Sequence, residues 1–185
     1  MSIRPSFLLL SAVCILALPS CSSYQSVFAP PSPAPGTKVN WPGVAFSEVR
    51  AYCYDYTAEE SPSFFTSGRM HKGVMDARGA KLSSAQVTKL LAAVTVSQPK
   101  QDRTPCYKPH HAFVFNDAGG KVVAVFEMCF GCNRWVETPD GAPEYIDKEA
   151  LWALCQELGL PTGVGNKFYT DACNDGRAAA HAATH

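Results

Sequence analysis

The sequence lacks a charge excess of either sign. It contains 16 Lys and Arg residues and 16 Asp and Glu residues, so its formal net charge is +0. A surface that binds nucleic acid needs clustered basic side chains to neutralise the phosphates. The sequence therefore gives no reason to expect nucleic acid as a partner.

Familiar catalytic motifs are also missing. There is no Gly-rich phosphate loop, no HExxH zinc helix and no GxSxG nucleophile turn in the sequence. The adjacent acidic residues Glu59 and Glu60 would point to opposite faces of a strand, which is a poor arrangement for a catalytic pair of carboxylates. These absences favour a binding protein over an enzyme.

Long hydrophobic runs are absent as well. The main apolar run, Phe7–Leu18, is shorter than the roughly 20 residues that a membrane-spanning helix needs. It follows the basic residue Arg4 and precedes Pro19-Ser20. A basic start, a short apolar run and a small residue at the exit are typical of a secretory signal. We therefore expect residues 1–20 to be a signal peptide.

The end of this segment has a more specific pattern. Leu18-Pro19-Ser20-Cys21 resembles the lipobox of bacterial lipoproteins, in which a Leu stands three residues before the lipid-bearing Cys. The resemblance implies that Cys21 becomes the N-terminus and carries lipid, including an acyl chain such as palmitate. It also implies, because Ser22 follows, an outer-membrane lipoprotein of the cell envelope that faces the periplasm. The membrane is then a partner through the lipid anchor; the alternative is a secreted protein cleaved near Ser20.

The two ends of the remaining chain differ in composition from its middle. Residues 21–42 contain five prolines, which predict an extended tether after the lipidated Cys. Residues 174–185 are rich in Ala and lack an apolar anchor, so we expect a disordered tail. Residues 43–173 remain, a length that suits a single globular domain. Loss of residues 1–20 leaves 15 basic and 16 acidic residues, a net charge of −1.

Apolar periodicity and turn residues predict an α+β domain with an antiparallel sheet. The clearest element is a hairpin whose strands are apolar on both faces, which favours a central place in the sheet. Ser83 and Gln86 form a predicted capping box at the start of the first helix. The element order is β-β-α-β-β-α, with strands at Val44–Tyr56, Met70–Asp76, His111–Phe115 and Val122–Phe130 and helices from Ser83 and from Asp147 to Leu158.

The register of this hairpin determines which residues meet beyond its open end. If Phe115 pairs with Val122, Cys106 falls level with Gly131. In the same register His110 lies across from Glu127, which would orient its imidazole. Extending the ladder past Pro109 is an extrapolation, because Pro interrupts strand pairing.

Cysteine is the residue type in this chain whose side chain offers the most reactive chemistry. Of eight Cys, Cys14 leaves with the signal peptide and Cys21 is assigned to lipid. An even number of Cys in an exported protein favours disulfides, and six allow 15 pairings. The six are Cys53, Cys106, Cys129, Cys132, Cys155 and Cys173. Among them, Cys53 is expected in the core or in a disulfide, and Cys155 as a buried thiol or the partner of Cys173.

One cluster admits three interpretations. Cys106, His110 and His111 enter the hairpin, and Cys129 and Cys132 leave it. In the first interpretation Cys106 bonds to Cys129 or Cys132 and stabilises a domain that binds an envelope protein or a small ligand. In the second, the three Cys and one of the two His hold zinc or copper. In the third, the CxxC performs thiol–disulfide redox chemistry, although residues 133–139 do not show the helix pattern that usually follows such a motif.

The same stretch carries a family resemblance. Its pattern is Cys106-Tyr107-x-Pro109-His110-His111, then Gly120-Lys121-x-Val123, then Cys129-Phe130-x-Cys132. The pattern resembles a domain of uncharacterised bacterial lipoproteins, with no established activity. The resemblance supports a cell-envelope address and marks the cluster, but it supplies no mechanism.

Overall fold

The computed structural model describes residues 32–183. The predicted signal peptide, the lipidation site Cys21 and the first part of the tether lie outside the described residues. Within the described range, none of the helices combines the length and apolar character needed to cross a bilayer.

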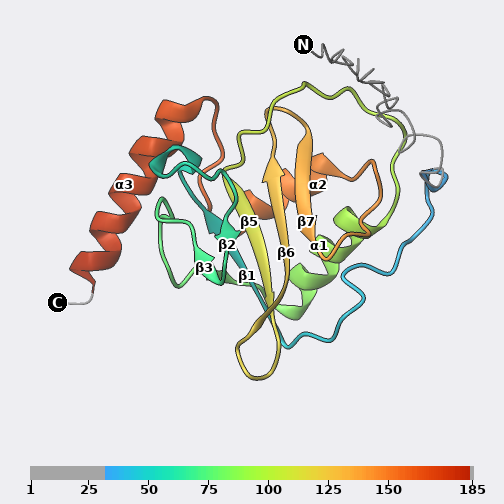
Figure 1. The fold of residues 1–185 in the computed structure, drawn as a ribbon, viewed down its shortest axis with the longest axis horizontal. Coiled ribbons are helices and arrows are strands. Elements are labelled where there is room, and N and C mark those ends of the chain that lie inside the picture. The colour runs from blue at the N-terminus through green and yellow to red at the C-terminus, as the bar shows by residue number, and fades with distance from the viewer. Residues whose placement is uncertain (1–31, 184–185) are drawn as a thin grey trace, which may run out of the picture. The chain divides into compact units, whose positions relative to one another are not determined.

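The described chain folds around a five-stranded antiparallel sheet (Figure 1). The strand order is β4-β1-β5-β6-β7, so the predicted hairpin of β5 and β6 has neighbours on both sides. The α+β class and the antiparallel sheet are confirmed. The strands are β1 (Glu48–Cys53), β4 (Ala80–Lys81), β5 (His111–Asn116), β6 (Val122–Cys129) and β7 (Arg134–Thr138).

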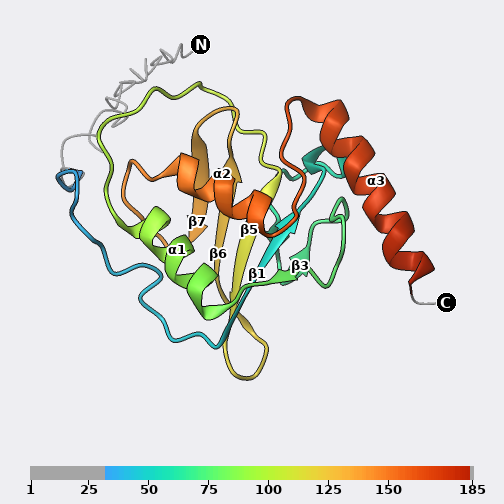
Figure 2. The ribbon, with the colours of Figure 1, turned by 180° about the vertical axis from the view of Figure 1, so that it is seen from behind.

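Helices cover one face of this sheet. Helices α1 (Ser84–Thr95) and α2 (Lys148–Glu157) lie side by side in front of the strands in Figure 2. The other face carries a two-stranded sheet, β2 (Phe65–Thr66) with β3 (Arg69–Met70), and a short 3₁₀ helix, η1 (Tyr56–Ala58). A third helix, α3 (Asn166–Ala182), lies beside the sheet.

Strand alternation explains how both faces of the hairpin become buried. Successive side chains of a strand point to opposite faces. Phe113 and Phe115 pack in the core with Leu90 of α1, whereas Ala112 and Val114 pack in the smaller core around Phe64. Each of these six side chains has an exposed fraction of 3% or less. The continuous apolar sequence of β5 therefore serves two separate cores.

The hairpin register differs from the predicted one. Asn116 pairs with Val122, but Phe115 pairs with Ala124, so a β-bulge occurs between these two pairs. A bulge places an additional residue on one strand and shifts every later pair. Glu127 consequently pairs with Ala112 and not with His110. The predicted contact between His110 and Glu127 was therefore wrong. The prediction that Cys106 lies opposite Gly131 in the continued register was wrong as well.

The strands around the hairpin also differ from prediction. The predicted strand Met70–Asp76 was wrong: Met70 ends β3 in the smaller sheet, and Val74 makes only an isolated bridge with Tyr54. The strand beside β1 is β4, which has two residues and too little sequence pattern to be recognised. Strand β7 was missed because Arg134–Thr138 is an edge strand with alternating exposed and half-buried residues.

Both predicted ends of the domain need correction. The predicted tether includes Trp41, which is buried, packs edge-on against Phe115, and donates its indole N–H to the carbonyl of Pro139 at 2.7 Å. The compact domain therefore begins before residue 43. At the other end, residues 174–182 of the predicted tail belong to α3, which is held through the buried residues Tyr169 and Cys173.

The two predicted helix starts are confirmed. The Ser83 hydroxyl accepts a hydrogen bond from the Gln86 N–H at 3.3 Å, and the Gln86 carboxamide oxygen accepts one from the Ser83 N–H at 2.8 Å. This is the capping box at α1. At α2, the Asp147 carboxylate accepts from the Ala150 N–H at 2.9 Å. Both caps satisfy amide groups that the first helical turn leaves without partners.

We predict that Ser83→Ala lowers the free energy of unfolding by about 1 kcal/mol, because the cap of α1 is lost. Urea unfolding followed by circular dichroism measures this change. The matched control is Ser84→Ala, since Ser84 is the exposed first residue of the same helix and its hydroxyl caps nothing. An equal loss of stability in both variants would contradict the assignment.

Candidate functional site

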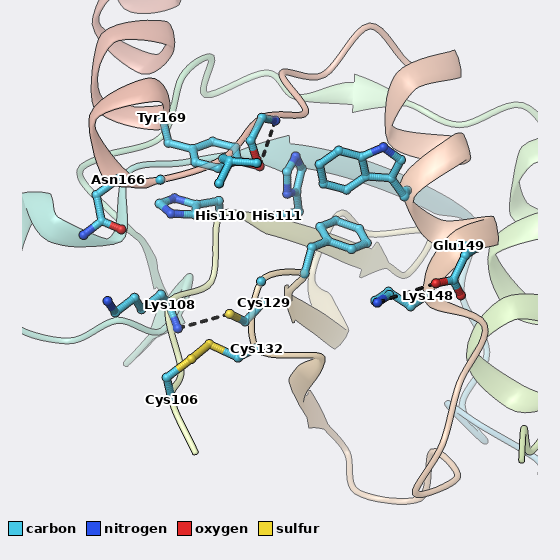
Figure 3. A pocket seen from close by; sticks show the side chains of 16 residues that line it. Cys106, Lys108, His110, His111, Cys129, Cys132, Lys148, Glu149, Asn166 and Tyr169 are labelled. Atoms are coloured by element: carbon cyan, nitrogen blue, oxygen red, sulfur yellow. Dashed lines mark hydrogen bonds and ion pairs between the residues drawn. A yellow bond between two sulfur atoms is a disulfide. The ribbon is translucent and has the colours of Figure 1, made fainter. Parts of the chain in front are cut away.

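A pocket of about 620 Å³ lies at the open end of the β5–β6 hairpin. The N-terminal turns of α2 and α3 approach it from two sides, and the sulfur-bearing turn after β6 closes a third (Figure 3). A volume of this size suits a small-molecule ligand. The lining residues are Cys106, Lys108, His110, His111, Cys129, Phe130, Gly131, Cys132, Lys148, Glu149, Trp152, Gly163, Val164, Gly165, Asn166 and Tyr169.

A disulfide between Cys106 and Cys132 forms one rim of the pocket. Their Cα atoms are 5.7 Å apart and their sequence separation is 26. In the chain-entropy model, closing such a loop stabilises the fold by about 3 kcal/mol. The structure therefore realises one of the two pairings expected for Cys106, and it leaves Cys129 as a thiol.

Cys129 lies directly beside this disulfide. The sulfur atoms of Cys106, Cys129 and Cys132 all lie within 4.8 Å of one another. The Cys129 sulfur is buried and accepts a hydrogen bond from the Lys108 N–H at 3.4 Å. We call Cys106, Cys129 and Cys132 the sulfur cluster.

A buried carboxyl group holds the chain next to the sulfur cluster. The Tyr107 hydroxyl donates to Glu127 at 3.1 Å, and the Tyr54 hydroxyl oxygen lies 3.4 Å from the same carboxyl group. Burial raises the pKa of the Glu127 carboxyl, and it raises the pKa of the Tyr107 hydroxyl as well. Since Tyr107 follows Cys106, the hydrogen bond to Glu127 fixes this segment against β6. Glu127 thus has a structural partner different from the predicted His110.

His110 is part of the pocket wall. Its Nδ1 atom lies 3.0 Å from the carbonyl oxygen of Tyr54, so Nδ1 carries the proton and donates. The imidazole stacks on the ring of Tyr169, with 3.8 Å between the centroids and an interplanar angle of 10°. Burial lowers the pKa of His110 and favours the neutral ring.

His111 is fully buried behind this stack. Its Nε2 atom lies 2.8 Å from the carbonyl oxygen of Pro161, so Nε2 donates. Its Nδ1 atom has no hydrogen-bond partner among the described residues. Burial lowers the pKa of His111 to about 4. The imidazole is therefore neutral at physiological pH and has one free acceptor atom.

The metal set predicted from the sequence is only partly assembled. The structure brings the three sulfurs together, but neither His110 nor His111 belongs to that group of close ligand atoms. Each imidazole instead directs one nitrogen to a backbone carbonyl. The hairpin places these histidines next to the sulfur cluster along the pocket, so their role is that of wall residues.

Two wall residues were not predicted from the sequence. The Trp152 ring meets the ring of Phe130 edge-on at 5.0 Å, and the hydroxyl of Tyr169 donates to the Gly163 carbonyl at 3.1 Å. Burial raises the pKa of this Tyr169 hydroxyl to about 12. Trp152 and Tyr169 lie far from the sulfur cluster in the sequence, so no local motif connects them with it. Only the packing of α2 and α3 brings them to the pocket.

The other cysteines form a separate buried group. The sulfurs of Cys53 and Cys173 are 4.0 Å apart and share a hydrogen bond. This hydrogen bond raises the pKa of Cys53 and lowers that of Cys173. Cys155 is a buried thiol, and burial raises its pKa to about 12. One expectation for Cys155 is thereby confirmed, while the neighbour of Cys173 is Cys53 instead of Cys155.

Comparisons with known proteins give no relative for this chain: no family model, no curated protein and no solved structure matches it.

We predict that His111 makes the fold less stable in acid. Between its ordinary pKa of about 6.5 and its folded value of about 4, the unfolded chain binds a proton that the folded chain does not. The free energy of unfolding therefore falls as the pH falls through this range, by at most about 3 kcal/mol from this residue. Urea unfolding at pH values across the range measures the loss.

The variant His111→Gln separates this contribution from those of other groups. Gln keeps an N–H donor for Pro161 and has no proton to gain, so the stability of this variant should fall less steeply with acid. His181→Gln, in the exposed last turn of α3, is the control substitution. The assignment fails if His111→Gln and the unsubstituted chain lose equal stability between neutral pH and pH about 4.

Proposed function

We propose that this chain is a lipid-anchored protein of the bacterial cell envelope whose disulfide-stabilised domain binds a small, ring-bearing anion. The observation that carries the proposal is the 620 Å³ pocket walled by aromatic side chains at the hairpin end. The proposed address rests on residues 1–21, and a disulfide such as Cys106–Cys132 suits an oxidising compartment like the periplasm.

Rings on two sides of the pocket favour a flat, apolar ligand. The stacked pair of His110 and Tyr169 forms one wall, and the edge-on pair of Phe130 and Trp152 forms another. His111 touches both pairs, with centroid distances of 5.2 Å to Phe130 and 5.6 Å to Tyr169. Aromatic walls bind a ring through offset or edge contacts, each contributing roughly 0.5–1.5 kcal/mol beyond area burial.

The charged residues of the pocket favour an anion. Lys108 and Lys148 line it, against the single carboxylate of Glu149. Glu149 pairs with Lys148 at 3.5 Å, and the exposed Lys108 ammonium has no ion pair within residues 32–183. The two neutral imidazoles add no charge. One positive charge is therefore left for an acidic group on the ligand.

We predict that naphthalene-1-sulfonate binds the purified full-length chain with a 1:1 stoichiometry, measured by isothermal titration calorimetry. Its fused rings match the aromatic walls and its sulfonate matches Lys108. Trp152→Ala should weaken the affinity about tenfold, since the lost ring contact is equivalent to about 1.4 kcal/mol. The neutral analogue 1-naphthalenemethanol should bind more weakly than the sulfonate, and Lys108→Gln should reduce that difference.

The control variant is Val136→Ala. Val136 is another apolar residue, but it is exposed on β7 and does not line the pocket. Its replacement should leave the affinity for naphthalene-1-sulfonate unchanged in a folded chain. Equal affinities of the Trp152→Ala variant and the unsubstituted chain would refute the proposed site. So would a titration with naphthalene-1-sulfonate in which the heat of binding does not saturate.

A second function is favoured by the sulfur cluster itself. After reduction of the disulfide, three thiolates would stand within 4.8 Å of one another. Thiolates are the ligands that select copper(I) and are also common for zinc. We propose binding of one such ion through Cys106, Cys129 and Cys132 in the reduced chain, without an imidazole ligand.

We predict that the reduced full-length chain retains one equivalent of copper(I) or zinc per chain after dialysis. Cys129→Ser should lower retention to a small fraction of one equivalent, because two sulfurs remain. Cys155→Ser, which removes a buried thiol outside the cluster, should retain the ion. Metal analysis by mass spectrometry gives the count. Full retention by Cys129→Ser would exclude this site.

A further inference from the structure

We infer that the sulfur cluster is an internal thiol–disulfide exchange site, in which Cys129 displaces Cys106 from its disulfide with Cys132. The inference rests on the placement of a thiol beside a disulfide and does not depend on the proposed ring-bearing ligand or on a metal. It gives the third sulfur a chemical role, since a structural disulfide needs only two.

The geometry places the attacking sulfur next to its target. All sulfur–sulfur distances in the cluster are at most 4.8 Å, so a small rotation of one side chain brings Cys129 into contact with the disulfide. Cys129 ends β6 and its sulfur is held by the Lys108 N–H. Cys132 follows in the tight turn between β6 and β7. A bond between these two Cys therefore stays within one short turn.

The exchange is balanced without an external oxidant or reductant. The Cys129 thiol loses its proton to solvent, and its thiolate attacks the Cys132 sulfur. The Cys129–Cys132 bond forms while the Cys106–Cys132 bond breaks, and the electron pair leaves with Cys106 as a thiolate that takes up a proton. Thiol–disulfide exchange proceeds by this displacement, and the number of disulfides does not change.

Burial decides which sulfur is released to solvent. Cys129 and Cys132 have exposed fractions of 2% and 3%, whereas Cys106 is half-buried. Cys106 also lies in residues 97–110, which have no regular secondary structure, so its displacement breaks no strand. The exchange therefore converts a buried thiol into an accessible one at the rim of the pocket. There it can form a mixed disulfide with a disulfide-bearing molecule, which releases one thiolate.

Tryptic peptides distinguish the two bonding patterns. Trypsin cleaves after Arg103, Lys121 and Arg134 but not between Lys108 and Pro109, so Cys106 lies in peptide 104–121 and both other sulfurs lie in peptide 122–134. The bond Cys106–Cys132 joins the two peptides. The bond Cys129–Cys132 leaves them separate and lies within peptide 122–134.

The experiment incubates the folded, oxidised full-length chain with iodoacetamide at mildly alkaline pH. Samples are quenched in acid, and their remaining thiols are blocked with N-ethylmaleimide in acidic denaturant. After digestion with trypsin, the masses of the peptides are measured by mass spectrometry. We expect carbamidomethyl Cys106 in peptide 104–121 to accumulate together with the internal disulfide in peptide 122–134. In Cys129→Ser the labelling of Cys106 should be at least about tenfold slower, because the attacking thiol is missing. Cys155→Ser, the control, should label like the unsubstituted chain.

Two outcomes would overturn the inference. One is that the two peptides stay joined by Cys106–Cys132 while only Cys129 becomes labelled. The other comes from Cys106→Ser, which remains informative if Cys129→Ser fails to fold. After treatment with oxidised glutathione, this variant should contain the Cys129–Cys132 bond. If both thiols stay reduced or carry only glutathione, the turn cannot accommodate the exchanged bond.

Discussion

The disulfide between Cys106 and Cys132 is the constraint on which the pocket depends, because it orders a long irregular segment. Residues 97–110 have no regular secondary structure, and fixing each residue of such a segment costs roughly 1–2 kcal/mol of backbone entropy. Long loops of this kind are uncommon in compact domains unless they serve a function. The Arg103 guanidinium lies 4.4 Å from the centroid of the Trp135 ring and 4.7 Å from that of Tyr145, and so holds the segment at its middle. The covalent bond holds the end that forms the pocket rim.

The opposite wall is held by weaker forces. Helix α3 has only two buried residues, Tyr169 and Cys173, which lie one helical turn apart. Tyr169 stacks on His110, and the Cys173 sulfur is 4.0 Å from that of Cys53 in β1. Arg177 adds a hydrogen bond to the Gly73 carbonyl at 2.9 Å. While the disulfide is intact, the pocket thus lies between a covalently fixed rim and a helix docked through a narrow apolar stripe, so a change in its width would come from α3.

The sequence predicted the elements whose signals are local and missed those that depend on distant packing. The capping box of Ser83 and Gln86 and the cap at Asp147 are short patterns, and both appear in the structure. Helix α3 has an Ala- and Gly-containing second half with little apolar periodicity, and it is buried only through Tyr169 and Cys173. The sequence correctly placed Cys106, His110, His111, Cys129 and Cys132 together at one end of the hairpin. It could not show that the imidazoles turn to the backbone, because that choice depends on Tyr54, directly after β1, and on Pro161, between α2 and α3, which supply the carbonyl acceptors.

The β-bulge connects the register with the chemistry of the sulfur cluster. Because Phe115 pairs with Ala124 and His111 with Met128, continuing the ladder by one residue brings His110 opposite Cys129. Cys106 then joins the turn after β6 and not the strand itself. Three sulfurs meet there, but they cannot all have the same role at once. The disulfide uses two and leaves a lone thiol, which is a weak metal site; reduction by two electrons supplies three thiolates and removes the covalent rim. The proposed metal binding and a fixed pocket rim therefore exclude each other, and the redox environment of the chain would select between them.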